Sequence, residues 1–254
     1  MLVDLGAGTA SSLDEGDAAN VGTDTFTGVR DVRGSQFGDT LVGSDGSGFE
    51  NFRGMGGDDV IDGGDGDHDR ADYLSSPDGV FVDLSAGIAQ DGHGGTDTLL
   101  NIERIRGSHN ADTLIGDAGD NNLDGRDGDD TLIGGGGADT LIGGGGLDVV
   151  DGGLGDDVLE LDGSVGVTAE GGAGADTVQL VGETNDASLS GVETVFGSSG
   201  DDDLTITTND IQSVSGGEGF DTVTLTDVEG NALDLDGVEV VTGSEGADTL
   251  TVLD

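Results

Sequence analysis

Aliphatic residues recur at every ninth position through the middle of the chain. From Gly107 to Glu160 the sequence divides into six consecutive nonapeptides: GSHNADTLI, GDAGDNNLD, GRDGDDTLI, GGGGADTLI, GGGGLDVVD and GGLGDDVLE. Their eighth position is always aliphatic: Leu114, Leu123, Leu132, Leu141, Val150 and Leu159. Because side chains alternate along a strand, the eighth residue points inward and its two neighbours point outward. The pattern predicts a strand at positions seven to nine of each repeat.

The first six positions of each repeat predict a tight turn. Glycine fills position one throughout and position four in five repeats: Gly107, Gly116, Gly119, Gly125, Gly128, Gly134, Gly137, Gly143, Gly146, Gly152 and Gly155. Glycine permits positive φ and close backbone approach, so the carbonyl groups of the turn can face one another. Position six, which ends the turn, is polar in every repeat: Asp112, Asn121, Asp130, Asp139, Asp148 and Asp157.

Two repeats are expected to form one full coil, with a turn and a strand on each side. The inward residues then form two files, one per sheet: Leu114, Leu132 and Val150, and Leu123, Leu141 and Leu159. The predicted fold is therefore all-β, a parallel β-roll or right-handed β-solenoid. One buried aliphatic side chain per repeat contributes roughly 1.5–3 kcal/mol, against an ordering cost of ~1–2 kcal/mol for each residue. This thin core needs a further source of stability.

The charge of the chain indicates what that source is. The 254 residues include 54 acidic and 7 basic side chains, which gives a formal charge of -47, and aromatic residues make up 3%. Such a composition alone is typical of disorder. However, hydrophobic residues total 33%, and aspartate recurs at fixed distances from glycine. An ordered state of so many carboxylates needs a counter-charge, and a hard divalent cation that prefers oxygen ligands, calcium, fits best.

The nonapeptides resemble the G-G-x-G-x-D-x-U-x pattern of the repeats-in-toxin family, also called haemolysin-type calcium-binding repeats. The resemblance implies that several calcium ions lie between the turns of successive coils. It also implies that the turn carbonyls and the sixth-position aspartates hold these ions. Asn121 departs from the pattern and is expected to weaken its site, because a neutral amide replaces a carboxylate.

A shorter block of calcium-type repeats is predicted at residues 54–71. GMGGDDVID at 54–62 matches the nonapeptide, whereas the next segment, GGDGDHDRADY, places His68 where an aspartate is expected. A one-residue slip would bring Asp69 into that place. The candidate metal residues here, together with one from the preceding segment, are Gly54, Gly57, Asp59, Gly63, Gly66, Asp67, Asp69 and Asp39.

A longer element recurs four times, at residues 28–41, 101–114, 191–204 and 237–250. Each copy predicts a strand, a turn and a second short strand. Towards the C-terminus these elements alternate with isolated calcium-type turns, which we expect to bind metal less readily: Asp176, Asp202, Asp221 and Asp248. We thus expect three regions: an N-terminal solenoid (1–106), the tandem array (107–160) and a coarser solenoid (161–254). Because the chain opens and closes within repeats, we also expect it to be part of a longer polypeptide.

Catalytic motifs are missing from the sequence. It has no H-E-x-x-H zinc motif, no G-x-S-x-G elbow and no cysteine, so we predict that the chain is not an enzyme. Its negative charge disfavours nucleic acid as a partner. No apolar run approaches the ~20 residues that span a bilayer, so direct membrane insertion is not expected. The predicted partners are calcium ions and other surface or repeat domains of the same parent protein.

These features predict a calcium-binding structural module of a secreted or cell-surface bacterial protein of the adhesin or surface-layer type. The family resemblance implies type I secretion, with folding on calcium binding after export. An alternative is the non-catalytic repeat region of a secreted protease, lipase or pore-forming toxin. The sequence preceding Met1 in the parent protein would discriminate between the two.

Overall fold

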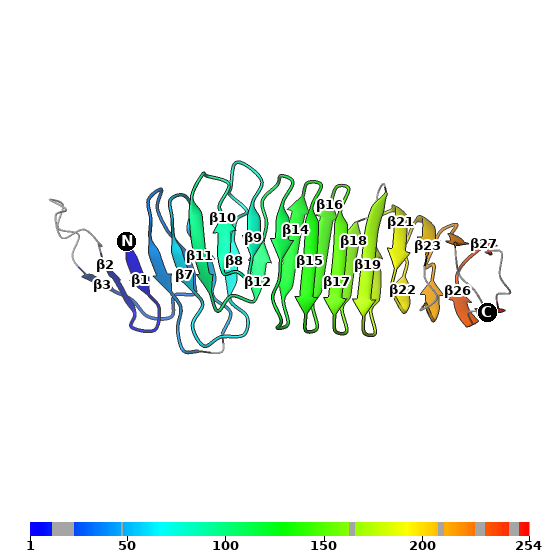
Figure 1. Cartoon of the computed structure of the whole chain (residues 1–254), viewed down its shortest axis with the longest axis horizontal. Helices are drawn as coiled ribbons and strands as arrows, with labels where there is room; N and C mark the ends of the chain where they lie inside the picture. The colour runs from blue at the N-terminus through cyan, green and yellow to red at the C-terminus, as the bar shows by residue number, and fades with distance from the viewer. Residues whose placement is uncertain are drawn as a thin grey trace. The chain divides into compact units, whose positions relative to one another are not determined.

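The computed structural model describes residues 1–11, 23–46, 48–162, 166–207, 211–226, 232–243 and 249–253. These residues form strands, turns and bends, and no helix occurs among them (Figure 1). Accordingly, the described part of the chain contains no helix that is long and apolar enough to cross a membrane. The chain divides into two compact units, Met1–Ile115 and Gly116–Asp254. The boundaries at residues 106 and 160 that the repeat types suggested stay a prediction.

Unit 1 contains strands of two sheets. Its sheet A strands follow the order β13 (Thr113–Ile115), β9 (Phe81–Asp83), β10 (Ile88–Gln90), β11 (Thr96–Leu100), β7 (Val60–Asp62), β5 (Thr40–Val42), β1 (Leu2–Asp4), β2 (Thr9–Ser11) and β3 (Thr23–Thr25). Its sheet B strands follow the order β12 (Arg104–Arg106), β8 (Arg70–Asp72), β6 (Asn51–Arg53) and β4 (Asp31–Arg33). The sheet B strands of this unit pair in parallel.

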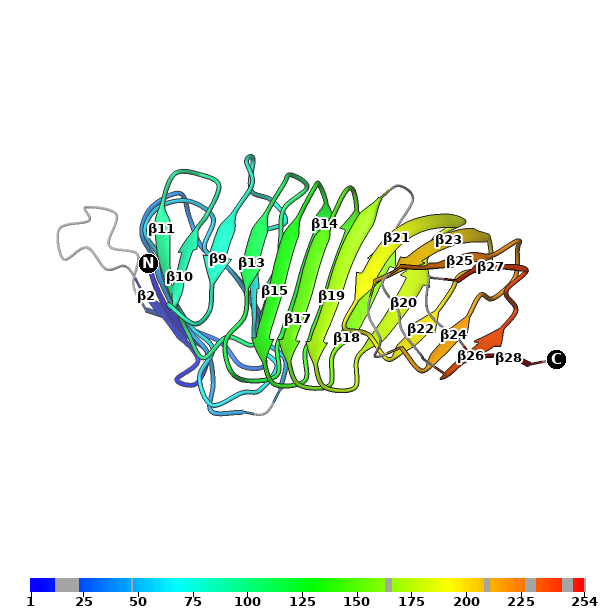
Figure 2. The ribbon, with the colours of Figure 1, turned by 45° about the vertical axis from the view of Figure 1, so that its right-hand side comes forward.

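Unit 2 is parallel throughout the pairs that the structure describes. Its sheet A strands are β15 (Thr131–Gly136), β17 (Val149–Leu154), β19 (Val167–Ala173), β21 (Thr184–Ser190), β23 (Asp201–Ile206), β25 (Thr222–Leu225) and β27 (Val240–Thr242). Its sheet B strands are β14 (Asn122–Asp127), β16 (Thr140–Gly145), β18 (Val158–Asp162), β20 (Thr177–Val181), β22 (Thr194–Phe196), β24 (Ser213–Ser215), β26 (Ala232–Asp236) and β28 (Thr249–Leu253). Figure 2 shows β15, β17 and β19 lying side by side.

The aliphatic files predicted from the repeat form the core of unit 2. Leu141 pairs with Leu123 on one side and with Leu159 on the other, all in sheet B. Leu132 pairs with Val150 in sheet A. These residues are at most 1% exposed. In unit 1, Leu114 lies opposite Val82. The predicted all-β solenoid with parallel sheets is confirmed.

The strands of the array are longer than the three residues predicted. Strands β14 to β17 each run for six residues and continue through the first half of the following turn. Gly135 still pairs with Gly153, and Gly136 with Leu154. Successive coils are copies in register, so the turn backbone can extend the ladder where glycines leave room for the neighbouring chain.

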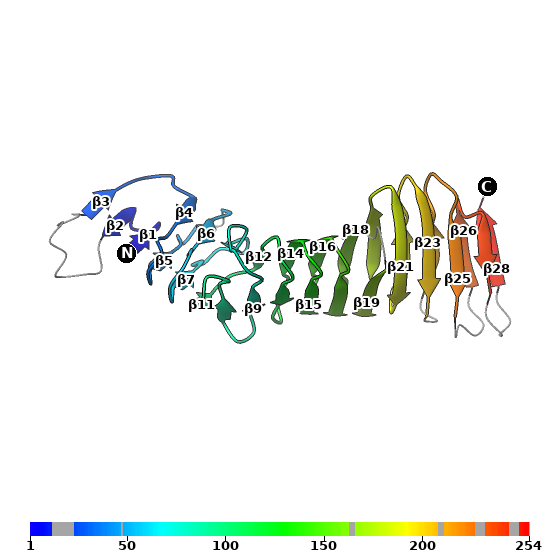
Figure 3. The same ribbon diagram turned by 90° about the horizontal axis from the view of Figure 1, so that it is seen from above.

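Unit 1 also contains antiparallel hairpins, which the repeat pattern did not predict. Strand β10 pairs antiparallel with both β9 and β11 (Figure 1). Strand β2 pairs antiparallel with both β1 and β3, and Figure 3 labels these three strands. Each hairpin starts at a V-D-L segment, where Oδ1 of Asp4 or Asp83 accepts a backbone hydrogen bond from the residue three positions later. These side chain to backbone bonds stabilise the turn that reverses the chain.

A buried ion-pair cluster joins three sheet B strands of unit 1. The side chain of Asp72 in β8 is fully buried. It accepts hydrogen bonds from Arg53 Nε at 2.7 Å and from Arg106 Nε at 2.9 Å. Burial raises the pKa of Asp72, but the hydrogen bonds from Arg106 and Arg53 outweigh burial and lower the pKa to about 2. The carboxylate therefore stays charged at neutral pH.

Candidate calcium sites in the turns

The sixth-position residues of the array form files that run from coil to coil. Oδ1 of Asp139 accepts a hydrogen bond from the backbone N–H of Asn121 at 2.7 Å. Oδ1 of Asp157 accepts one from Asp139 at 2.8 Å, and Oδ1 of Asp148 accepts one from Asp130 at 3.0 Å. Each bond joins residues 18 positions apart, which is one coil. The turns thus bring together the aspartates that the nonapeptide pattern predicted.

The second carboxylate oxygen of these aspartates has no donor. Each of Asp139, Asp148 and Asp157 is only 1% exposed, and its Oδ2 atom is buried without a hydrogen-bond partner. A buried anionic oxygen without a partner is costly. The same orphaned oxygen recurs beyond these three turns, for example at Asp59, Asp69, Asp176 and Asp221. These oxygens fit the ligand that a hard cation requires.

Backbone carbonyls lie beside these orphaned oxygens. A Cβ atom built on Gly134 would lie 2.4 Å from Asp139 Oδ2 and 2.4 Å from the carbonyl oxygen of Gly152. A Cβ atom on Gly152 would lie 2.6 Å from Asp157 Oδ2 and 2.4 Å from the carbonyl oxygen of Gly171. Only glycine leaves this space open. Two oxygens of different coils share it, which fits the all-oxygen coordination of calcium.

Side chains alone do not form a metal cluster in the described ranges, where no three His, Asp or Glu residues converge on one point. An ion in the turns would depend on the carbonyl groups for much of its coordination. The remaining glycines are consistent with that arrangement. The first-position glycines of the array are buried: Gly107, Gly116, Gly125, Gly134, Gly143 and Gly152. Most fourth-position glycines have positive φ: Gly128, Gly137, Gly146 and Gly155, but not Gly119.

The electrostatics of the turns favour a cation. Burial and, to a smaller extent, the charge of Asp157 raise the pKa of Asp139 to about 6, and the hydrogen bond from Asn121 opposes them. Burial likewise raises the pKa of Asp59 and of Asp69 to about 6. The same cause raises the pKa of four other turn carboxyls: Asp148, Asp157, Asp176 and Asp221. Each carboxylate is thus destabilised in its charged form until a positive charge approaches.

In the 54–71 block the structure places Asp69, rather than Asp67, in the turn. Asp69 is 1% exposed, and its Oδ1 accepts the backbone N–H of Glu50 at 3.0 Å. Asp67 is exposed and pairs with the ring of His68. A Cβ atom on Gly66 would lie 2.2 Å from Asp69 Oδ2. The one-residue insertion is absorbed in the exposed part of the turn. In the preceding repeat, Asp59 and Gly54 are buried and Gly57 has a φ of 105°.

Other candidate turns satisfy the side-chain oxygen from within the chain. Asp112 Oδ2 accepts the N–H of Ser108 at 2.6 Å, and Asp202 Oδ2 accepts that of Ser198 at 2.8 Å. The remaining two turns of this type pair Asp39 with Ser35 at 2.5 Å and Asn121 with Asp117 at 2.7 Å. Asp248 lies outside the described residues.

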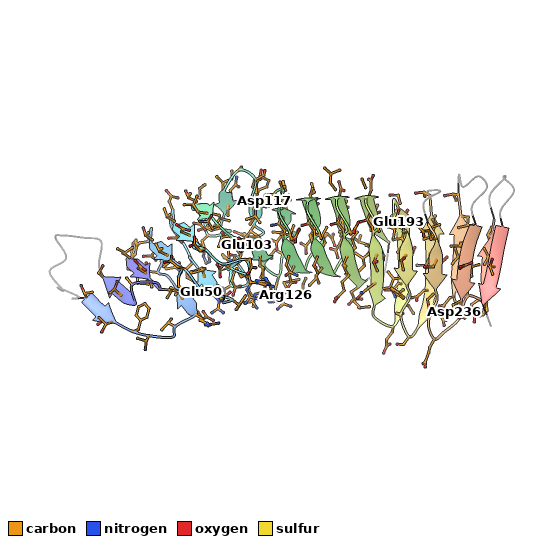
Figure 4. All side chains as sticks on the ribbon, turned by 90° about the horizontal axis from the view of Figure 1, so that it is seen from below. Glu50, Glu103, Asp117, Arg126, Glu193 and Asp236 are labelled. Atoms are coloured by element: carbon orange, nitrogen blue, oxygen red, sulfur yellow. The ribbon has the colours of Figure 1, made fainter. Side chains whose placement is uncertain are left out.

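Three glutamates that the sequence analysis did not single out take the aspartate's place at the end of a file. Glu193 Oε2 accepts the N–H of Asp176 at 2.6 Å, and Glu239 Oε2 accepts that of Asp221 at 2.7 Å. Glu103 Oε2 accepts the N–H of Asp69 at 3.1 Å; Figure 4 labels Glu103 and Glu193. The signal was present, because a glutamate recurs at the third position of the elements at 101–114, 191–204 and 237–250.

Stacked glycine and aspartate turns on a parallel β-solenoid define a class of calcium-binding repeat protein. The family model of the RTX calcium-binding nonapeptide repeat (4 copies) matches residues 44–67, 107–141 and 124–159. These segments are RTX repeats, and the family predicted from the nonapeptides is confirmed. No curated protein matches the chain as a relative.

Proposed function

We propose that the chain is a calcium-dependent structural module of a secreted or cell-surface bacterial protein of the adhesin or surface-layer type. RTX repeats in a β-solenoid make it a calcium-binding repeat module. The observation that carries the proposal is the series of buried carboxylate oxygens without donors, at Asp139, Asp148 and Asp157 among others. A fold that buries such oxygens needs the cation in order to be stable.

Different groups of atoms have different roles in folding and calcium binding. The aliphatic files hold the two sheets together, the aspartate Oδ1 atoms fasten each coil to the next, and the Oδ2 atoms and turn carbonyls receive the ion. Calcium, when bound, supplies the positive charge that offsets the repulsion among carboxylates in a chain of charge -47. Because the unfolded chain offers no such sites, binding to the folded state stabilises it by mass action.

This coupling suits a protein that folds after export. Where free calcium is scarce, inside the cell, carboxylate repulsion favours an extended chain that a narrow exporter can pass. Outside, calcium at about the millimolar level that extracellular modules require drives folding. We assign the module a non-catalytic role, supported by a sequence without the H-E-x-x-H and G-x-S-x-G motifs. Its partners are then calcium and neighbouring domains of its parent protein.

Circular dichroism of the full chain tests the proposal. In a chelator the spectrum should be that of a disordered chain, and added calcium should restore the β signal cooperatively. Magnesium at equal concentration is the control, and it should be far less effective because it demands octahedral geometry and retains its water. A β spectrum that persists unchanged in chelator would overturn the proposal.

A further inference from the structure

The turns of this chain fall into two kinds that differ at their second position. In one kind, called capped here, the backbone N–H of position two donates to the side-chain oxygen of position six. Asp202 shows the complete arrangement. Its Oδ2 accepts the N–H of Ser198 at 2.8 Å, while its Oδ1 accepts the Ser198 hydroxyl at 3.0 Å and Asn185 Nδ2 at 2.6 Å. The residues that cap their turns in this way are Ser35, Ser108, Asp117 and Ser198.

In the second kind, called open here, position two has a left-handed backbone and Oδ2 has no partner. Asp221 shows this arrangement, with Gly217 at position two and a φ of 101°. The other pairs of left-handed residue and orphaned aspartate are Gly135 with Asp139, Gly144 with Asp148, Gly153 with Asp157, and Gly172 with Asp176. None of the capping residues has positive φ.

The two kinds differ by the orientation of one peptide plane. The N–H and C=O of a trans peptide point in opposite directions. A plane that turns the position-two N–H away from the carboxylate therefore turns the position-one carbonyl oxygen towards that side. The capped turn presents a donor to its carboxylate, whereas the open turn leaves the carboxylate without one and gains an oxygen ligand. A donor and a cation are alternative ways to satisfy the same buried oxygen.

Met55 separates this backbone effect from residue type. It stands at position two of the Asp59 turn and adopts a φ of 79°, although left-handed backbone is uncommon and costly for a residue with a branched or bulky side chain. Asp59 Oδ2 is orphaned, as in the glycine turns. The open arrangement thus occurs even where the residue does not favour it.

We propose that the backbone at position two decides which turns bind calcium: open turns bind an ion, and capped turns are closed by the chain's own N–H and bind none. This assignment rests on the proposed function. It gives calcium to the isolated turns of Asp176 and Asp221, which the sequence led us to expect to bind metal less readily than the tandem array. It assigns no calcium to the turns of Asp39, Asp112, Asn121 and Asp202. Asp112 and Asn121 belong to the first two repeats of the array.

Neighbouring turns of one file give a matched test. The N–H of Asp202 donates to Asp221 Oδ1 at 3.0 Å, so the capped and open carboxylates are adjacent. Asp221→Asn and Asp202→Asn each remove one negative charge and keep an acceptor oxygen. Bound calcium per full-length chain is counted by equilibrium dialysis and metal analysis. Asp221→Asn should lose at least one ion relative to the unchanged chain, whereas Asp202→Asn should lose none.

A second pair, Asp148→Asn (open) and Asp112→Asn (capped), repeats the comparison, and circular dichroism in calcium identifies any variant that fails to fold. Equal losses from the open and capped members of a folded pair, or a loss from the capped member alone, would overturn the assignment while leaving the proposed function intact. An unchanged chain that binds no calcium would overturn both.

Discussion

The backbone N–H of Asp139 donates a hydrogen bond to Oδ1 of Asp157, 2.8 Å away and one coil later. The same contact joins Asn121 to Asp139 and Asp157 to Asp176. One carboxylate therefore serves two purposes, because Oδ1 fixes the register of neighbouring coils while Oδ2 remains for a cation. A substitution that removes the metal ligand therefore also removes the hydrogen bond between coils, unless the new side chain keeps an acceptor oxygen.

Two substitutions of Asp157 should separate these purposes. Asp157→Asn keeps an acceptor but removes the charge, so it should raise the calcium concentration at the folding midpoint. Asp157→Ala also leaves the N–H of Asp139 without its acceptor, which lowers the free energy of unfolding by about a further 1–3 kcal/mol. Calcium titration followed by circular dichroism measures both. Asp156→Asn, in the same turn but exposed, is the control; a midpoint shift as large as that of Asp157→Asn would show that bulk charge alone matters.

Adjacent glycines should respond differently to alanine. A Cβ atom on Gly144, where φ is 91°, would lie 1.8 Å from the carbonyl oxygen of Arg126. The left-handed backbone alone costs roughly 1–2 kcal/mol for alanine, and the clash adds to it. At Gly145 the nearest atom is Asp127 Oδ1 at 3.7 Å. Thermal denaturation in saturating calcium should show a large loss for Gly144→Ala and little change for Gly145→Ala, and similar losses would contradict the assigned backbone.

The aliphatic file should be sensitive to truncation. Leu141 is fully buried between Leu123 and Leu159, so Leu141→Ala should lower the free energy of unfolding by about 2–5 kcal/mol. Leu154 is 66% exposed, and Leu154→Ala serves as the matched control with an expected change below about 0.5 kcal/mol. Urea denaturation at fixed calcium measures both. Equal effects would mean that the core is not where the repeat pattern puts it.

The Asp72 cluster should make unit 1 sensitive to acid in a defined window. The pKa of Asp72 is lowered from 3.8 to about 2, so its charged form stabilises the fold above pH 4 or so, and this stability is lost as the pH falls towards 2. Asp72→Asn should therefore cost about 2 kcal/mol at neutral pH. The difference between variant and unchanged chain in urea denaturation should shrink as the pH falls below about 4.

Asp31→Asn is the control for that experiment. Asp31 contacts the same Arg53 at 3.4 Å, but its side chain is 60% exposed, so the expected effect is small. A difference that stays constant from neutral pH to pH 3 would show that Asp72 is not held in its charged form by the arginines.

Repetition made much of the fold predictable. The aliphatic eighth position alone identified the pairing of Leu123, Leu141 and Leu159, because a fixed period allows only one stacking of identical coils. The antiparallel hairpins of unit 1 were not predictable in this way, since each occurs in a segment whose length breaks the period. The glutamate acceptors Glu193 and Glu239 were missed because their role depends on which coil they follow, not on the nonapeptide.

The state of each turn was only partly predictable from the sequence, because position two is glycine in most open turns and serine or aspartate in the capped ones, but not without exception. Met55 adopts a left-handed backbone that its residue type does not suggest, and Ser108 donates an N–H that any residue possesses. The difference lies in a peptide orientation, and tertiary contacts between coils set that orientation. Sequence alone could therefore identify the aspartates of the turns but not the hydrogen bonds of their oxygens.

The constant spacing of 18 residues between the hydrogen-bonded sixth-position residues Asn121, Asp139 and Asp157 has an evolutionary consequence. An in-frame duplication or deletion of one whole coil there reproduces every inter-coil contact, so the module can lengthen or shorten without new compensating mutations. A change of a single nonapeptide instead moves every later strand to the opposite sheet. Inheritance should thus favour pairs of repeats, and the span between the domains flanking such a module becomes a quantity that selection can adjust in uniform steps.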